Sequence, residues 1–251
     1  MQVTGKSPTT MKNCLFTGNG GYATEDDAAF SPKRSGVVVF NLDAAATAVT
    51  MESCTVAYNV SSKGHAVGVQ IDKGALTVKD SIFYRNQFNT NLTGTCGADL
   101  YVGASATANV SYSLVTGQEA PWVYAETDGA VTWGEGVVTG DPLFVTTTDE
   151  YLSHLAEDKN NKGNVRLRFT DDSPFFNHHL RGRRGYLDEE TGVEVKKLGK
   201  VESPAIDAGD PAADCSREPA VRKPRLNLGF YGNTPWATAT YEPAGLMLIV
   251  R

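Results

Sequence analysis

A short sequence pattern recurs in the first half of the chain, and it constrains the fold more than any other feature. Residues 10–19 (TMKNCLFTGN) return as residues 50–59 (TMESCTVAYN) and again as residues 77–86 (TVKDSIFYRN). A weaker copy occupies residues 109–117 (NVSYSLVTG). The copies start 40, 27 and 32 residues apart, and self-similarity at such periods is typical of stacked repeat proteins. We therefore expect each copy to form one level of a repetitive fold.

Each repeat has the composition of β-strands joined by tight turns. The copies are rich in Val, Thr, Phe and Ile and most close on Asn, which are strand and turn signals. A second strand-like run precedes three of them, at residues 37–42, 66–71 and 98–102. The first 145 residues show no helical period. The sequence predicts an all-β fold, a right-handed parallel β-helix, in which each coil buries its inward side chains against the neighbouring coils.

Stacked coils bring equivalent side chains into columns, because adjacent strands lie about 4.8 Å apart. The alignment predicts a column of small side chains, an apolar column and an asparagine ladder: Cys14, Cys54, Ser81 and Ser113; Phe16, Val56, Phe83 and Val115; Asn19, Asn59 and Asn86. Asn suits the turn because it tolerates left-handed backbone and its amide can bond to the next amide. The outward positions carry mixed charges typical of a solvated face: Lys12, Glu52, Lys79 and Ser111.

The repeats stop after DPLFV at residues 141–145, and this point divides the chain into two parts. Residues 1–145 are predicted to form the parallel β-helix coils. Residues 146–251 are predicted to complete the same domain with the last coils, a long polar excursion and a loop-rich C-terminal cap. Because no capping element precedes Thr10, we expect further N-terminal coils in a longer chain.

Two motifs in the second part carry a family resemblance. They are SPAIDAGDP at residues 203–211 and NLGFYGNTPWA at residues 227–237, preceded by DPLF. In this order they resemble the C-terminal end of bacterial secreted right-handed β-helix proteins, which have pectin-lyase-like folds and include choice-of-anchor proteins. The resemblance covers about residues 10–240. It implies an extracellular or cell-surface location, and it implies no particular activity because this fold hosts many functions.

The resemblance also implies structural roles for single residues of these motifs. Ile206 would plug the last coil, and Gly209 and Gly232 would allow turns that a Cβ forbids. Asp207 and Asp210 would accept backbone N–H groups at the turn. The alternative is that these two carboxylates bind Ca²⁺, which prefers oxygen ligands.

Composition excludes several functional classes. The chain has 23 basic and 29 acidic residues and a net charge of −6, which argues against a general nucleic-acid binder. No apolar run is long enough to span a membrane, and the N-terminus lacks the apolar region of a signal peptide. Cys14 and Cys54 are expected as buried thiols, whereas Cys96 and Cys215 lie in predicted loops and can pair. No zinc motif or cofactor motif is present.

Two groups of side chains are candidates for glycan binding. The first follows the repeats and consists of Trp122, Tyr124 and Trp133, whose rings either stack on sugars or pack the excursion onto the coils. The second is a polar cluster in the excursion, and it consists of His178, His179, Arg181, Arg183 and Arg184. Arginine forks suit carboxylate or sulfate groups. The alternative is that the cluster pairs with nearby acids, which are Asp171, Asp172, Asp188, Glu189 and Glu190.

The sequence favours a scaffold over an enzyme. The predicted outward columns do not bring together the paired carboxylates that polysaccharide hydrolases need. The leading hypothesis is an exported bacterial β-helix surface or glycan-associated scaffold without its own catalytic site. The alternative is a polysaccharide lyase or glycoside hydrolase of pectin-lyase-like fold that acts on an anionic glycan.

Overall fold

The structure is a computed structural model of the 251-residue chain. It describes residues 1–21, 37–42, 47–61, 66–88, 97–153, 155–157, 165–167, 176–196, 200–219 and 225–239. The described residues are mostly strands, with one short helix, α1 (Thr148–Ser153). The all-β prediction is therefore confirmed.

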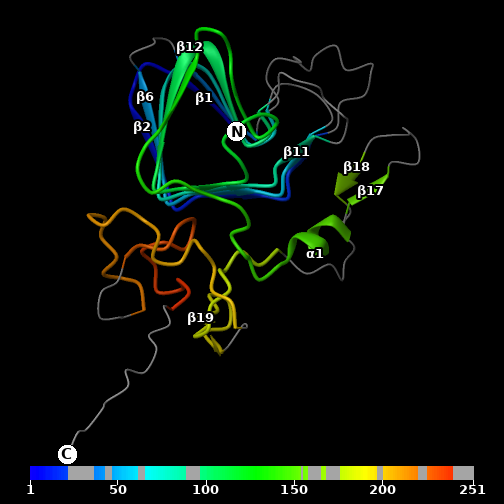
Figure 1. Ribbon diagram of the computed structural model, residues 1–251, viewed down its shortest axis with the longest axis vertical. Helices are drawn as coiled ribbons and strands as arrows, with labels where there is room; N and C mark the ends of the chain where they lie inside the picture. Colours follow the sequence, from blue (N-terminus) through cyan, green and yellow to red (C-terminus); the bar gives the residue numbers. More distant parts are fainter. Residues whose placement is uncertain are drawn as a thin grey trace, which may run out of the picture.

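Three parallel sheets make up the first part of the molecule (Figure 1). The largest has eight strands: β1 (Gln2–Gly5), β2 (Thr9–Lys12), β5 (Val38–Leu42), β6 (Ala48–Glu52), β9 (Val69–Lys79), β12 (Leu100–Ser111), β14 (Val123–Ala125) and β15 (Ala130–Trp133). The second has five strands: β3 (Leu15–Thr17), β7 (Thr55–Ala57), β10 (Ile82–Tyr84), β13 (Leu114–Val115) and β16 (Val138–Thr139). The third has three strands: β4 (Gly20–Gly21), β8 (Val60–Ser61) and β11 (Gln87–Phe88).

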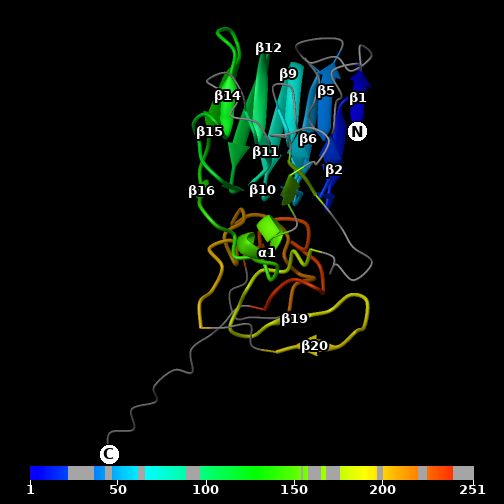
Figure 2. The ribbon, with the colours of Figure 1, turned by 90° about the vertical axis from the view of Figure 1, so that its right-hand side faces the viewer.

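The first three passages of the chain run through all three sheets in the same order, and the last two run through the two larger sheets. Each passage adds one level, which we call a layer. The described residues of the five layers are 1–21, 37–42 with 47–61, 66–88, 97–117 and 118–140. Figure 2 shows the strands of successive layers side by side, from β1 at one end to β14, β15 and β16 at the other. A side chain therefore packs on its equivalents in the layers before and after it.

The predicted columns are confirmed by the strand register. Phe16 pairs with Val56, Val56 with Phe83, and Phe83 with Val115. Hydrogen bonds link the small-residue column, because the backbone N–H groups of Cys54 and Ser81 donate to the hydroxyls of Ser81 and Ser113 at 3.0 and 3.1 Å. The inward columns of apolar side chains form one continuous core between the sheets.

The asparagine ladder is also confirmed, and it ends on an aspartate. Asn19 Nδ2 donates to Asn59 Oδ1 at 2.9 Å, and Asn59 Nδ2 donates to Asn86 Oδ1 at 2.8 Å. Asn86 Nδ2 then donates to Asp99 Oδ1 at 2.8 Å. The ladder residues do not adopt the left-handed backbone that the sequence suggested. That conformation belongs to the residues before them, which are Gly18, Tyr58 and Arg85.

A second set of left-handed residues forms the corner between the first two sheets: Asn13, Ser53, Asp80 and Tyr112, with φ between 41° and 53°. These corners anchor the C-terminal motifs. Asn13 Nδ2 donates to the carbonyls of Phe230 and Gly232, each at 2.8 Å. Asp80 Oδ1 accepts the N–H of Asp210 at 2.7 Å. The corner residues thus connect the stack to segments 130 or more positions away in the sequence.

The C-terminal part packs on the outer face of the five-stranded sheet (Figure 1). A second apolar core forms there between outward side chains of this sheet, such as Ile82 and Leu114, and residues of the second part, such as Phe144, Leu180 and Leu228. The prediction that these motifs cap the end of the stack is wrong, because they contact layers one to three from the side. Ile206 belongs to this lateral core and does not plug the last layer.

The remaining elements are short. β17 (Leu155–Glu157) pairs antiparallel with β18 (Val165–Leu167), and β19 (Tyr186–Leu187) pairs antiparallel with β20 (Glu194–Val195). Within the described part of the chain, no helix is long and apolar enough to cross a membrane.

Candidate functional site

The polar excursion folds as an extended segment and a small hairpin that are fixed by local chemistry. Gly185 and Gly192 adopt φ values of +85° and +66°, which L side chains rarely adopt. A Cβ at Gly185 would also lie 1.8 Å from the carbonyl oxygen of Val195 across the hairpin. The hairpin β19–β20 therefore depends on this glycine.

His178 is a buried structural residue. Its Nδ1 lies 2.9 Å from the carbonyl of Phe176, and its Nε2 lies 2.9 Å from the hydroxyl of Thr17. A carbonyl only accepts, so Nδ1 carries the proton and Nε2 accepts from Thr17. Burial lowers the pKa of His178 to about 4, so the ring is neutral near pH 7. Its role is to connect the excursion to the first layer.

His179 forms the centre of an aromatic stack. Its ring lies between those of Tyr186 and Tyr231, at centroid distances of 3.6 and 3.9 Å. His179 Nε2 lies 2.9 Å from Glu189 Oε2, and the Tyr231 hydroxyl donates to the other carboxylate oxygen. Burial lowers the pKa of His179 even though Glu189 opposes the shift. A neutral imidazole that donates to Glu189 follows from this arrangement.

A small pocket of about 260 Å³ lies on the Tyr231 side of the stack. It carries an acidic rim, with the following lining residues: Phe176, Asn177, His179, Asp188, Glu189, Glu190 and Tyr231. His179 is only 1% exposed and its Nε2 is engaged by Glu189, so it is poorly placed to take a proton from a ligand.

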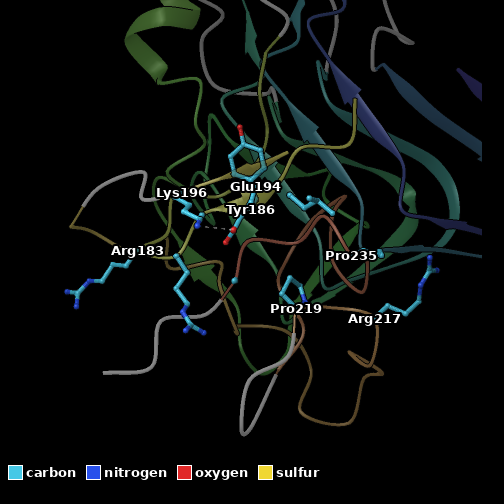
Figure 3. Close-up of a pocket in the computed structure, with 11 residues that line it drawn as sticks. Arg183, Tyr186, Glu194, Lys196, Arg217, Pro219 and Pro235 are labelled. Atoms are coloured by element: carbon cyan, nitrogen blue, oxygen red, sulfur yellow. Dashed lines mark ion pairs between the residues drawn. The ribbon is translucent and has the colours of Figure 1, made fainter. Parts of the chain in front are cut away.

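A larger pocket of about 740 Å³ lies on the Tyr186 side of the stack (Figure 3). Its basic lining residues come from three parts of the chain: Arg183, Arg184, Lys196 and Arg217. One acid, Glu194, is present, and it lies 3.4 Å from Lys196. The other lining residues include apolar side chains: Tyr186, Leu187, Pro219, Pro235 and Ala239.

The basic pocket combines an apolar floor with a cationic rim. In Figure 3, Arg183 and Arg217 extend from opposite sides of the pocket, with Pro219 and Pro235 between them. Pockets of 300 to 1,000 Å³ that are largely apolar with a few charged groups are typical small-molecule sites. The pocket has four basic side chains and one acidic side chain, which is paired with Lys196, so its lining is net basic.

The structure brings only some of the predicted glycan-binding residues together. Arg183 and Arg184 line the basic pocket, whereas His179 borders the acidic pocket. Arg181 instead donates to the carbonyl of Val145 at 3.1 Å, so its charge is used within the fold. Among the predicted acidic partners, Asp171 and Asp172 lie outside the described residues. The pairing alternative is realised at His179 with Glu189.

The three aromatic candidates lie in the fifth layer, and neither pocket includes them. Trp122 is half-buried beneath the guanidinium of Arg85, whose Cζ lies 5.6 Å from the ring centroid. Tyr124 stacks on Tyr101, the equivalent residue of the layer before. Trp133 packs against the apolar core between the sheets. These contacts are those of packing residues.

Asp207 and Asp210 do not form a shared carboxylate site. Asp210 Oδ2 binds Lys79 Nζ at 2.6 Å, and Asp210 Oδ1 accepts the N–H of Ala212 at 2.8 Å. The second contact is the predicted turn contact. Asp207 instead takes a left-handed backbone, and its N–H donates to Asn227 Oδ1. Across the described residues, no group of three or more His, Cys, Asp or Glu side chains is suited to a metal ion.

The glycines and cysteines of the prediction also have defined places. At Gly209 and Gly232 a Cβ would lie 2.7 and 2.4 Å from neighbouring atoms, so close packing rather than φ excludes a side chain. Cys14 and Cys54 are thiols of adjacent layers, and burial raises the pKa of Cys54 to about 12. Cys96 lies outside the described residues. Cys215 is a half-buried thiol that forms no disulfide, so the predicted pairing of the two is wrong.

Sequence reasoning missed Lys196, Arg217 and the apolar floor of the basic pocket. Arg217 lies between the two C-terminal motifs, and Pro235 lies in NLGFYGNTPWA, to which the sequence analysis gave a structural meaning only. The one available signal for this site was a basic residue close to a proline, as Arg217 is to Pro219.

No family model, curated protein or solved structure matches this chain.

Proposed function

We propose that this chain is a right-handed parallel β-helix that serves as a scaffold and binds an anionic glycan through its basic pocket. The recurrent layers, the uniform parallel pairing and the asparagine ladder support the β-helix. The scaffold would be exported by a bacterium and would act outside the cell or at its surface, as the family resemblance implies.

The observation that carries the proposal is the charge of the basic pocket. Arg183, Arg184 and Arg217 are exposed and line this pocket together with Lys196, against one acidic side chain, Glu194. Arg183 Nε donates to the carbonyl of Lys200 at 3.0 Å, which orients the guanidinium group. Uronate carboxylates and sulfate esters are the anionic groups of glycans, and an apolar floor of prolines and Tyr186 suits the faces of sugar rings.

The test asks whether the chain binds an anionic glycan without cleaving it. Isothermal titration calorimetry with polygalacturonate and with a sulfated glycan should show binding, whereas neutral dextran should show none. Each charge-assisted contact is worth about 1.5 to 3 kcal/mol, so the double variant R183Q/R184Q should weaken binding at least about tenfold. R217Q should weaken it too, and K73Q on β9 is the matched charge control. Equal affinity for neutral dextran would refute the proposal. Unchanged affinity of R183Q/R184Q and R217Q for the anionic glycans would refute it as well.

A second candidate is a polysaccharide lyase or glycoside hydrolase, and the acidic pocket is the observation that favours it. Asp188, Glu189 and Glu190 border this pocket with Tyr231, and carboxylates beside a phenol can serve acid–base chemistry. The same glycan incubations should be followed for unsaturated uronate and for new reducing ends. If the chain cleaves one of these glycans and E189Q abolishes the cleavage, the enzyme hypothesis is correct and the scaffold hypothesis is wrong.

A further inference from the structure

Two segments of the chain together line one part of the basic pocket (Figure 3). The first pocket segment carries Arg217 and Pro219, and the second pocket segment carries Pro235 and Ala239. Glu218 lies between the two lining residues of the first segment, and its side chain is half-buried. The contacts of this side chain therefore decide where the first segment is held.

Glu218 connects the first pocket segment to the closing motif through a single carboxylate oxygen. Its Oε1 accepts the backbone N–H of Asn227 at 2.9 Å and the backbone N–H of Asn233 at 2.8 Å. These two asparagines begin and end NLGFYGN, the part of the motif that directly precedes the second pocket segment. One oxygen thus holds both ends of this heptapeptide.

The two asparagines extend the connection to both pocket segments. Asn227 Nδ2 donates to the carbonyl of Thr238, within the second segment, at 2.8 Å. Asn233 Oδ1 accepts the backbone N–H of Arg217, in the first segment, at 3.1 Å. A short network of hydrogen bonds therefore joins the two segments, and the carboxylate of Glu218 lies at its centre.

The negative charge of Glu218 does not favour the ligand of the proposed function. A carboxylate beside a pocket with four basic side chains offsets part of their attraction for an anion. A favourable contribution of Glu218 to anion binding must therefore come from its geometry. The relevant property is the reach of the side chain, which brings one oxygen to two backbone N–H groups.

We propose that Glu218 is a positioning residue of the basic pocket: it fixes the first pocket segment against the second and so holds Arg217 toward a bound anionic group. This role rests on the proposed function, because the ligand is the same anionic glycan. Glu218 itself does not touch the ligand. The reach of residue 218, and not its charge, then determines the affinity.

Two substitutions separate reach from charge. E218D keeps the negative charge, but its side chain is one methylene shorter, so its oxygen cannot meet both N–H groups while the two segments keep their spacing. E218Q removes the charge, and its amide oxygen can still accept both N–H groups. Burial raises the pKa of Glu218 to about 7, so the comparison is made at pH 8, where the native carboxylate is ionised.

The assay is isothermal titration calorimetry with polygalacturonate and with the sulfated glycan. E218D should bind about tenfold more weakly than the native chain, which is the scale of one lost charge-assisted contact. E218Q should bind as tightly as the native chain or more tightly. E119D and E119Q, at an exposed site of the fifth layer, are the matched controls. Near-UV circular dichroism checks that each variant is folded.

A double-variant cycle tests whether Glu218 acts through Arg217. In the R217Q background, E218D should cause little further loss of affinity, because the contact that Glu218 positions is already absent. In the R183Q background, E218D should still weaken binding by its full factor. A purely structural role would lower the melting temperature of E218D without this selectivity.

Three results would each overturn the role of Glu218 while glycan binding by the native chain stands. They are native affinity in E218D, a loss of affinity in E218Q as large as in E218D, and a full further loss when E218D is added to R217Q. If the native chain binds neither anionic glycan, the proposed function and the role of Glu218 are both wrong.

Discussion

Asp99 ends the asparagine ladder, and its replacement by asparagine tests the logic of the ladder. Asn59 and Asn86 each use Nδ2 twice, once toward the next ladder residue and once toward a backbone carbonyl, of Phe16 and Val56 respectively. The equivalent carbonyl for residue 99 is that of Phe83. That carbonyl already accepts the N–H of Thr116 at 3.1 Å. A carbonyl oxygen has two lone pairs, so this bond alone does not exclude a second donor. The donors that already face both side-chain oxygens of residue 99 are the reason that a carboxylate fits there.

The carboxylate of Asp99 is surrounded by donors. Asn86 supplies its backbone N–H at 3.2 Å and its Nδ2 at 2.8 Å to Oδ1, and the Thr116 N–H lies 3.3 Å from Oδ2. The Thr116 hydroxyl accepts from the N–H of Arg85, so its own proton is available to Asp99. In D99N, either orientation of the amide directs its NH₂ group at donors. Leaving buried donors unsatisfied costs about 1 to 3 kcal/mol.

An opposing effect is present, because burial raises the pKa of Asp99 despite these donors. The ionised carboxylate thus retains a desolvation cost that D99N would remove. We expect the lost hydrogen bonds to dominate, and D99N to lower the free energy of unfolding by about 2 kcal/mol at pH 7. Urea unfolding should show a lower midpoint at an unchanged m value. D128N, the same chemical change at an exposed site, is the control.

Two results would refute this reasoning. If D99N unfolds within about 0.5 kcal/mol of the native chain, a typical surface effect, the donors around Asp99 contribute nothing specific. If D99N is more stable, desolvation of the carboxylate outweighs its hydrogen bonds, and the aspartate is a cost that the fold tolerates.

Three further predictions concern the C-terminal part. Burial lowers the pKa of His178 from 6.5 to about 4, so between these pH values the unfolded chain binds a proton that the folded chain does not. The free energy of unfolding should therefore fall by about 3 kcal/mol as the pH is lowered from 6.5 to 4. H178Q should remove this pH dependence, measured by urea unfolding at a series of pH values. Burial raises the pKa of Glu218 from 4.5 to about 7, so stability is lost as pH rises through that window; E218Q should raise the melting temperature more at pH 8 than at pH 5, and an equal effect at both would contradict the assignment. G229A should detach the C-terminal motif, because a Cβ there would lie 2.6 Å from Thr55 Oγ1 and 2.9 Å from Ile82 Cδ1 at a φ of +89°; we expect a loss of about 2 kcal/mol or more in calorimetry and increased proteolysis near residue 229.

The sequence analysis predicted the stack well because its signals are local and repeated. An apolar or amide side chain that recurs at equivalent positions must lie next to its equivalents when parallel strands pair, so the alignment specifies the register. Phe16, Val56, Phe83 and Val115 could be aligned by eye. The end of the ladder could not, since Asp99 precedes its strand by one residue and has no counterpart in the other copies.

The candidate site could be predicted only in part for the same reason. Arg183 and Arg184 were visible as a dense basic cluster. Arg217 lies more than thirty residues further along the chain, between the two C-terminal motifs. Neighbouring arginines in sequence also took different roles, because Arg181 reached a backbone carbonyl and Arg183 and Arg184 reached the surface.

By itself, the sequence determined the all-β class, the boundaries of the repeats and the columns of stacked side chains, since each depends on periodicity within the strands. Only the tertiary structure decided that the C-terminal motifs pack against the side of the stack. That choice depends on Asn13 and Asp80 at the corners, and on the apolar outer face of the second sheet around Ile82 and Leu114. Contacts between such distant segments depend on the shapes of two surfaces that exist only after each segment has folded. A short sequence pattern describes only one of these segments.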